Sequence, residues 1–492
     1  MKEMRPWLSH RAALTPHRTA VVCGDNVLDY QTFARCVWKC ADELLGRGVE
    51  PGDVVAILLG NGFPIVQLLH ALDHCGATLV PLNVRLTQTE LTHQLRDSGA
   101  ALLLHGQGEL AQRGVAACEE VGGLGALEMS DAGALSETHS PRDLRKAASP
   151  NHGGLAILYT SGTTGLPKGA LLTHGCFEAS AASSALHLGV WPGDRWLVCM
   201  PIFHVGGLSI PIRSVLYGTA ALLHERFDEQ RVNHTIDTEG VTLVSLAPAM
   251  LDRLLVARGN RRAPPALRCV LLGGGPADSD LLERARELSF PVAPTYGLTE
   301  AASQVATQLP NDGASPHGAG LTPLPGTELR TVDPKGRNVG TGEAGEILVR
   351  SDTVMKRYVN RPLETREALR GGWLHTGDIG TLDDRGRLRV LDRRSDLIIS
   401  GGENVYPAEV EAALLLHPAV LEAGVAAQPD RRFGSRPAAW LVVGDGAPSD
   451  EELSDFCRQR LAGYKVPASF HRVGSLPRNA SGKLQRRHLT TA

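Results

Sequence analysis

The sequence of 492 residues lacks both an excess of charge and a long apolar run. Its formal net charge is only −3, whereas nucleic-acid binding usually requires a basic patch, so we expect no nucleic-acid partner. The most hydrophobic region, residues 54–72, is interrupted by Asn, Pro, Gln and His, and no stretch of 18 apolar residues occurs. We therefore expect no stable membrane insertion. The first 20 residues also lack the apolar core of a signal peptide.

The cysteines and histidines of the sequence form no disulfide or zinc pattern. The nine cysteines are scattered and odd in number, and only Cys36 and Cys40 lie close together, one helical turn apart. There is no CxxC motif, and the 18 histidines include no HExxH motif. We expect reduced thiols and a cytoplasmic, globular protein rather than a disulfide scaffold or a structural zinc site.

Short apolar runs alternate with amphipathic stretches in two separate blocks, residues 53–106 and residues 219–275. Such alternation predicts parallel strands with helices on both faces of each sheet. The polar segment 136–154 is rich in turn-forming residues and is predicted to be a loop. Hydrophobic residues make up 42% of the chain, which is enough to fill several cores, and the length suggests about three domains or large subdomains.

The predicted secondary-structure pattern of the sequence changes twice in its second half. Beyond about residue 310, short strand patterns separated by Gly and Asp turns predict a β-subdomain, and the last hundred residues indicate a small α+β unit. The charged run LDRRSD suggests a boundary at Asp392. The predicted fold class is α/β: an N-terminal domain, 1–391, of two α/β subdomains plus a small β-subdomain, followed by an α+β C-terminal domain, 392–492.

The segment LAILYTSGTTGLPKGA, residues 155–170, predicts a phosphate-binding loop. Gly162 and Gly165 free the backbone for an anion-binding concavity, to which Lys168 adds a positive charge. The hydroxyl donors are Thr160, Ser161, Thr163 and Thr164. An apolar strand precedes the loop, and residues 170–186 after it can form a helix. The loop is not a Walker A motif, because glycine and alanine follow the lysine, which argues against a P-loop kinase. A plain Ser/Thr-rich turn is the alternative.

Read whole, YTSGTTGLPKG resembles the phosphate loop of the acyl-adenylate-forming superfamily. This superfamily includes acyl- and aryl-CoA ligases, luciferases and the adenylation domains of peptide synthetases. Further segments resemble its motifs in the same order: PTYGLTE, WLHTGD, LDRRSDLIISGGENVYPAEVE and LPRNASGK. The resemblance spans nearly the full chain and implies ATP, Mg²⁺ and coenzyme A as its ligands.

The resemblance assigns roles to individual residues. The implied ATP- and AMP-binding residues are Thr160, Ser161, Gly162, Thr163, Thr164, Gly165, Lys168, Gly274, Tyr296, Gly297, Thr299, Asp378 and Arg393. Glu300, a hard oxygen ligand, would hold Mg²⁺ together with Thr160. The Asp378 carboxylate can accept hydrogen bonds from two ribose hydroxyls at once. Outside this context, Asp378 would be an ordinary turn residue and Glu300 a partner of a helix dipole.

The resemblance also implies two half-reactions and a mobile C-terminal domain that turns about a hinge at Asp392. Lys483 would balance charge between the substrate carboxylate and the α-phosphate during adenylation, with His204 and Arg393 as further catalytic residues. After rotation, the domain would present a coenzyme A channel. The channel residues are Ser400, Gly401 and Gly402.

The pocket for the acid is implied to lie among PIFHVGGLSIPIRSV, SLAPAM and LLGGGPA. Its residues are His204, Val205, Gly206, Gly207, Ser209, Gly273 and Gly275. FHVGGLS, LLGGGPA and LPRNASGK are similar to the o-succinylbenzoate–CoA ligase family of menaquinone biosynthesis, which converts 2-succinylbenzoate, ATP and CoA to 2-succinylbenzoyl-CoA, AMP and diphosphate. A second substrate carboxylate would need a cation. Arg213 is a candidate, although Pro211 is expected to limit its helix to about the first turn.

Three alternatives remain open on the sequence. A fatty-acid or aryl-acid CoA ligase would share the nucleotide chemistry but need no partner for a second carboxylate. A stand-alone adenylation enzyme would charge a carrier protein and ignore free CoA. A catalytically inactive scaffold is disfavoured by the complete set of motifs. The expected partners are a small carboxylic acid, ATP and CoA, and a homo-oligomer is possible.

Overall fold

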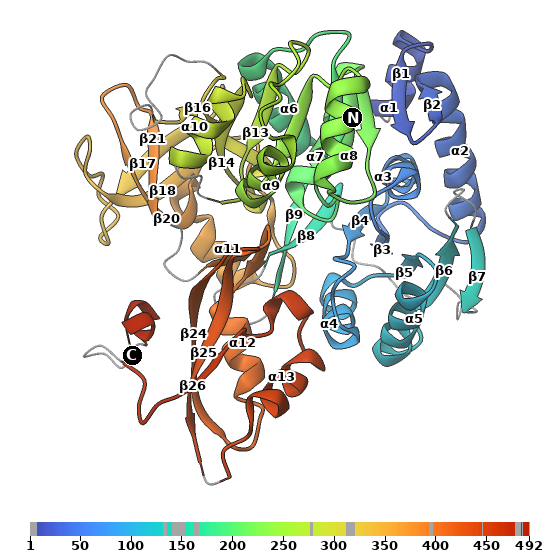
Figure 1. Cartoon of the computed structure of the whole chain (residues 1–492). Helices are drawn as coiled ribbons and strands as arrows, with labels where there is room; N and C mark the ends of the chain where they lie inside the picture. The colour runs from blue at the N-terminus through green and yellow to red at the C-terminus, as the bar shows by residue number, and fades with distance from the viewer. Residues whose placement is uncertain are drawn as a thin grey trace.

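Figure 1 shows a large N-terminal part and, below it, a small C-terminal unit in orange and red. The computed structural model describes residues 7–130, 135–139, 153–160, 167–275, 279–310, 320–392, 397–444, 446–477, 484 and 486–491. Three sets of predicted site residues lie outside these ranges: residues 161–165 of the phosphate loop, Arg393 and Lys483.

The first α/β subdomain is built on an eight-stranded sheet with the order β19-β9-β8-β4-β3-β5-β6-β7. Its strands are β3 (Val54–Leu58), β4 (Thr78–Pro81), β5 (Leu102–His105), β6 (Gly125–Met129), β7 (Leu135–His139), β8 (Ala156–Thr160), β9 (Lys168–Leu172) and β19 (Arg357–Tyr358). Its crossover helices are α3 (Phe63–Cys75), α4 (Gln88–Ser98) and α5 (Glu109–Val121). Strands β3, β4, β5, β6 and β8 run parallel, as the alternation of strand and helix patterns predicts.

The second α/β subdomain carries a nine-stranded sheet with the order β16-β15-β14-β13-β12-β10-β11-β1-β2. Its strands are β1 (Thr19–Cys23), β2 (Asn26–Asp29), β10 (Arg195–Val198), β11 (Ala220–Leu223), β12 (Leu243–Leu246), β13 (Cys269–Leu272), β14 (Val292–Leu298), β15 (Ser303–Thr307) and β16 (Thr322–Pro323). Its helices are α6 (His174–Leu188), α7 (Val205–Tyr217), α8 (Glu229–Thr238), α9 (Pro248–Arg258) and α10 (Ser279–Glu287). The strands from β1 to β14 along this order are all parallel.

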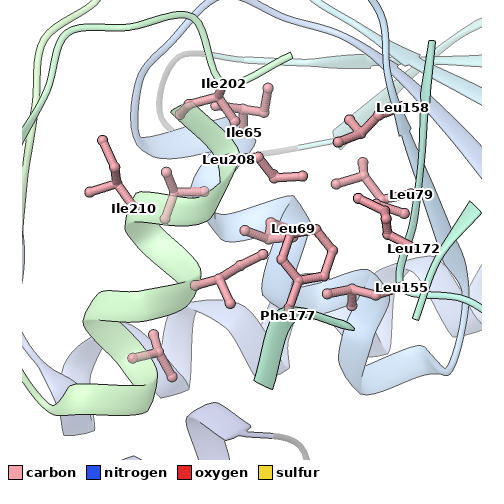
Figure 2. Packing of buried hydrophobic residues seen from close by; sticks show 14 of the residues in the cluster. Ile65, Leu69, Leu79, Leu155, Leu158, Leu172, Phe177, Ile202, Leu208 and Ile210 are labelled. Atoms are coloured by element: carbon pink, nitrogen blue, oxygen red, sulfur yellow. The ribbon is translucent and has the colours of Figure 1, made fainter. Parts of the chain in front are cut away.

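One hydrophobic core joins the two subdomains. Successive residues of a strand point to opposite faces, so the fully buried strand β3 serves two cores. Val54 packs in a cluster with α4 and α5, whereas Val55 packs in the central cluster with α3 and α7. Figure 2 shows part of this central cluster, which includes Leu69 of α3 and Phe177 of α6. The shared core fixes the two sheets relative to each other.

The N-terminal segment completes the second sheet rather than the first. Helices α1 (Trp7–Leu14) and α2 (Tyr30–Gly46) flank β1 and β2. Strand β1 pairs in parallel with β11, about 200 residues later, with Val21 opposite Ala221. Apolar periodicity in one segment does not specify such a distant pairing, and the sequence did not predict it.

Two antiparallel strands, β8 and β9, flank the predicted phosphate loop, so the helix predicted from residue 170 is wrong at its start. Residues 168–172 form β9, which pairs antiparallel with β8 and sets Thr160 opposite Lys168. Helix α6 starts only at His174, after Thr173 caps it by accepting a hydrogen bond from the Cys176 amide. The run Ala-Leu-Leu suits either element, and pairing with a buried strand decides it.

Two further predictions need correction. Leu135 to His139 form the edge strand β7, antiparallel to β6, although residues from 136 were predicted to be a loop. Helix α7 continues to Tyr217 with Pro211 inside it. Proline removes a single backbone hydrogen bond, the one to the carbonyl of Gly207, and the many buried contacts of α7 compensate for this loss.

An antiparallel four-stranded sheet forms the predicted β-subdomain. Its strands are β17 (Glu328–Val332), β18 (Gly345–Arg350), β20 (Leu374–Leu382) and β21 (Leu388–Asp392). Helix α11 (Pro362–Ala368) precedes β20. Asp392 is the last residue of β21, and the boundary proposed at this residue stays a prediction.

The small C-terminal domain has its own five-stranded sheet and hydrophobic core. Its elements are β22 (Ile398–Ser400), β23 (Glu403–Val405), α12 (Pro407–Leu414), β24 (Val420–Asp430), β25 (Gly434–Val443), α13 (Asp450–Arg458) and β26 (Phe470–Arg472). This confirms a large N-terminal α/β domain followed by a small α+β domain. Of the helices within the described ranges, none is long and apolar enough to cross a membrane.

Candidate active site between the two domains

A cavity of about 250 Å³ lies where the carboxyl ends of the parallel strands meet the C-terminal domain. Ligands of open α/β sheets bind at this edge. Eleven of the predicted site residues line it: Thr160, His204, Val205, Gly206, Gly273, Gly274, Gly297, Thr299, Glu300, Asp378 and Gly402. The cavity therefore joins motifs that lie more than 200 residues apart in the sequence.

Asp378 lies on the cavity wall, in β20, and is oriented by Tyr296. The Tyr296 hydroxyl donates a hydrogen bond to Asp378 Oδ2 over 2.7 Å. Tyr296 is only 2% exposed and is not among the cavity-lining residues. The predicted nucleotide-binding tyrosine thus lies behind the carboxylate and holds it in place.

Glu300 lies in a single 3₁₀ turn, residues 299–301, between β14 and β15. Its Oε1 accepts a hydrogen bond from the Tyr358 hydroxyl over 2.7 Å. Across the described part of the chain, its carboxylate has no other hydrogen-bond or ion-pair partner. A carboxylate at a cavity wall with remaining acceptor capacity fits Mg²⁺, which usually takes one or two protein carboxylates and completes its shell with water and phosphate.

The described ends of the phosphate loop lie next to this turn. Thr160 and Pro167 line the cavity. Lys168 Nζ lies 5.6 Å from the centre of the Tyr358 ring. Tyr358 therefore lies between the lysine at the end of the loop and the carboxylate of Glu300.

His204 connects the two domains through Glu403. It is the residue directly before α7, and its Nε2 lies 3.0 Å from Glu403 Oε2. Arg85 approaches the other oxygen of Glu403 at 3.2 Å. Burial raises the pKa of Glu403, but His204, Arg85 and Lys465 together outweigh this effect, so its pKa falls below the ordinary value. Glu403 is thus held ionised beside the predicted catalytic histidine.

A buried ion triad fastens the C-terminal domain to the first subdomain. Lys465 Nζ lies 2.7 Å from Glu90 Oε1 in α4 and 2.6 Å from Glu409 Oε1 in α12. All three residues are buried. Burial lowers the pKa of Lys465, but the two carboxylates outweigh it and raise the pKa above its ordinary value. The other oxygen of Glu90 accepts from Thr87 in the capping box of α4, so the triad is anchored in a helix terminus.

The predicted pocket glycines divide into two groups. Gly206 lines the cavity, and a methyl group there would meet only the flexible end of Met200, at 3.4 Å. A methyl group on Gly207 would overlap the backbone carbonyl of Pro201. Gly207 is therefore needed for close packing of α7 rather than for room in the pocket.

Other predicted residues are near the cavity without lining it. Ser209 is buried, and its hydroxyl donates to the Val205 carbonyl. Gly275 faces Ile399 of the C-terminal domain, so this predicted pocket residue lies in a domain contact. Ser400 is buried, and Gly401 packs on Phe433. Gly401 and Gly402 both have positive φ, +60° and +88°, which places a glycine-dependent turn beside the cavity.

Sequence reasoning missed several residues of the wall. These are Asn83, Ser303, Thr376, Tyr464 and Lys465. Lys465 and Tyr464 lie in the short segment Gly-Tyr-Lys, where a lysine between tyrosine and valine was the only available signal. Asn83 donates to Glu403 and to the Tyr464 hydroxyl, so it belongs to the same domain contact.

Comparison with models of known protein families shows to which family this chain belongs. A model described as AMP-binding enzyme matches residues 8–359, and one described as AMP-binding enzyme C-terminal domain matches residues 409–483. The chain belongs to the AMP-binding enzyme family. The 2-succinylbenzoate–CoA ligase of Geobacillus kaustophilus is 47% identical, covering 99% of this chain and 98% of that protein. The ligase of the same name from Bacillus licheniformis is 43% identical, with 98% of both chains covered.

Two solved structures of o-succinylbenzoate CoA synthetase from Bacillus subtilis distinguish two shapes. A double mutant bound to a product analogue has a TM-score of 0.90 to this chain, at 40% identity and 99% coverage of both chains. The complex with the acyl-adenylate intermediate scores only 0.73, at 41% identity, covering 100% of this chain and 99% of that one. Because the identities are nearly equal, the difference lies in shape: this chain matches the product-analogue form.

We expect Gly207→Ala to destabilise the protein by about 1–3 kcal/mol, because the added methyl forces the start of α7 away from Pro201. Gly206→Ala is the matched control and should leave the free energy of unfolding within about 0.5 kcal/mol of the parent. Urea titration of both variants measures the difference. Equal stability of the two variants would contradict the close packing assigned to Gly207.

We expect Lys465→Met to lower the free energy of unfolding by about 3–5 kcal/mol, because it leaves two buried carboxylates without a cation. Adding Glu90→Gln and Glu409→Gln should restore much of that loss, since a glutamine at position 90 still suits the capping box. Chemical denaturation of the single and triple variants tests this. If the triple variant is no more stable than the single one, burial of the charges is not the cause.

Proposed function

We propose that this protein is an ATP-dependent acid–CoA ligase that acts on 2-succinylbenzoate through an acyl-adenylate, in menaquinone biosynthesis. The observation that carries the proposal is the single cavity that unites Thr160, Glu300 and Asp378 with Gly402 of the C-terminal domain. The relatives named 2-succinylbenzoate–CoA ligase, 42–47% identical over nearly the full length, support the choice of acid. Bacillus subtilis structures with ATP and magnesium and with AMP support the nucleotide.

In the first half-reaction, an oxygen of the substrate carboxylate attacks the α-phosphorus of ATP, and diphosphate leaves. Asp378, oriented by Tyr296, would accept hydrogen bonds from the ribose hydroxyls. Glu300 and Thr160 would hold Mg²⁺, which neutralises phosphate charge when bound. The hydroxyls and amides of the phosphate loop, with Lys168, would position the phosphates. Lys483 and Arg393 complete the proposed set.

In the second half-reaction, the CoA thiolate attacks the acyl carbon of the mixed anhydride, and AMP leaves. The likeness to the product-analogue form supports the view that this structure has the thioester-forming arrangement. In it, Gly402 and Glu403 line the cavity next to His204. We propose that Ser400, Gly401 and Gly402 border the path of the CoA arm and that the domain turns about Asp392 between the two steps.

Arg213 is our proposed partner for the second carboxylate of 2-succinylbenzoate. It is 2% exposed and lies in α7, two turns beyond the cavity-lining Gly206. Its Nη2 donates to Ser180 Oγ over 3.0 Å, and Ser180 Oγ donates to the carbonyl of Ala302, the neighbour of cavity-lining Ser303.

Among the described residues, no carboxylate pairs with Arg213, and its Nε has no hydrogen-bond partner. Burial lowers its pKa, and the nearby Tyr217 partly offsets this. A buried guanidinium with unused donors is costly unless an anion completes it. Arg213 lies over the Trp196 ring at 5.7 Å and does not line the cavity, so we propose that the second carboxylate reaches it past Ser303.

The deciding experiment measures AMP release from ATP with CoA present, for o-succinylbenzoate, benzoate, octanoate and palmitate, with mass detection of the thioester. A preference for o-succinylbenzoate supports the proposal. A preference for a monocarboxylic acid would replace it with an aryl- or fatty-acid ligase. AMP release without any CoA thioester would favour a stand-alone adenylation enzyme. The cytoplasmic location and a possible homo-oligomer are further proposals, which cell fractionation and sedimentation test.

We expect Arg213→Leu to reduce kcat/KM for o-succinylbenzoate by about tenfold to a hundredfold, because a hydrogen bond to a charged group is lost. An analogue that keeps the reacting carboxylate but lacks the other one should be insensitive to the substitution, since it has no group for Arg213 to recognise. Arg213→Lys, which keeps the charge, is the matched control. Equal losses for the dicarboxylate and this analogue would reject this role.

We expect Lys483→Ala to slow adenylation by about 100-fold or more while the melting temperature stays unchanged, because it removes an electrostatic contact made in the transition state. Conversion of supplied acyl-adenylate and CoA to thioester should persist. Diphosphate release measures the first step and thioester formation the second. Full adenylation by this variant would contradict the assignment.

A further inference from the structure

The segment around β19 links the two parts of the cavity wall that would bind metal and phosphate. The Met355 amide donates to the Glu300 carbonyl over 2.7 Å. Further along, Tyr358 pairs with Ala170 of β9, and the Val359 amide donates to the Gly169 carbonyl. Glu300 lies between strands of the nine-stranded sheet, whereas β9 belongs to the eight-stranded sheet. This short segment therefore fixes the position of the turn that carries Glu300 relative to β9 at the cavity.

The Tyr358 side chain also connects the two sheets, because it contacts one charged side chain from each of them. Its hydroxyl donates to Glu300 Oε1 over 2.7 Å, and its ring lies 5.6 Å from Lys168 Nζ. It is 5% exposed, so its ring is fixed by packing. A carboxylate held at one oxygen keeps its other oxygen in a defined direction, and outer contacts of this kind orient metal ligands.

We propose that Tyr358 is a positioning residue for the Mg²⁺ of MgATP: it fixes the orientation of the Glu300 carboxylate. The proposal rests on the adenylation function proposed above. Without the hydroxyl, the Glu300 carboxylate would lose the hydrogen bond that orients it and would be free to rotate. A metal ligand without a fixed orientation binds its metal less tightly.

The substitution Tyr358→Phe tests this role because it removes only the hydroxyl. We expect the Mg²⁺ concentration for half-maximal adenylation to rise about tenfold, the lower end of the usual effect of losing an outer contact of a metal ligand. The maximal rate at saturating Mg²⁺ should stay within about twofold of the parent. Thioester formation from supplied acyl-adenylate and CoA, which needs no MgATP, should be unchanged.

A binding measurement separates metal positioning from a general defect. By titration calorimetry, ATP without Mg²⁺ should bind the parent and Tyr358→Phe equally, whereas the gain in ATP affinity on adding Mg²⁺ should shrink about tenfold in the variant. In a Glu300→Gln background, Tyr358→Phe should have no further effect on that gain. Independent effects of the two substitutions would overturn the proposal.

Tyr30→Phe is the matched control for loss of a buried hydroxyl. Tyr30 donates to the carbonyls of Ser214 and Thr219, away from the cavity, so its variant should lose stability and keep the parental Mg²⁺ dependence. If Tyr358→Phe behaves like Tyr30→Phe, the hydroxyl has only a structural role and the inference fails. If the parent protein shows no Mg²⁺-dependent adenylation at all, the proposed function fails instead.

Discussion

Parallel strands place all their carboxyl ends at one edge of a sheet, and here two such sheets turn that edge toward the same cavity. The shared core of α3, α6 and α7 fixes the angle between the sheets, so side chains from both converge without any loop having to reach far. The third wall comes from the C-terminal domain. Buried polar contacts help to hold it there, which suits the domain rotation proposed above.

Glu403 and Lys465 both hold the C-terminal domain against the N-terminal part and form part of the cavity wall. Each is buried at the domain boundary and lines the cavity, and each is neutralised by groups from the N-terminal part. Charged groups in such a place contribute little net stability but strongly disfavour partial separation, since an unpaired buried charge is costly. The arrangement therefore favours docked or fully undocked states over intermediate ones.

Much of the fold could be predicted from the local pattern of apolar and polar residues in the sequence. The apolar runs around Val54 and Val270 are strands, and the motif around Asp378 lies on the cavity wall, because burial and turn chemistry are local signals. The pairing of β1 with β11 and the strand start at Lys168 were not predictable, because non-local partners decide them. Tyr358 and Lys465 were missed for the same reason: their importance arises only from groups brought close by folding.

The antiparallel strand pair that flanks the predicted phosphate loop has a consequence for how anions are held. In many nucleotide sites the loop runs directly into a helix, whose dipole and first amides provide positive potential. Here the whole of β9 separates the loop from α6, and the first amides of α6 are capped by Thr173. At the proposed phosphate site, positive potential would therefore come from the loop's own amides and hydroxyls and from the Lys168 ammonium rather than from a helix end. Such a site should lose phosphate affinity more sharply as salt increases than one at a helix end, because a partly exposed ammonium is screened more readily than backbone dipoles.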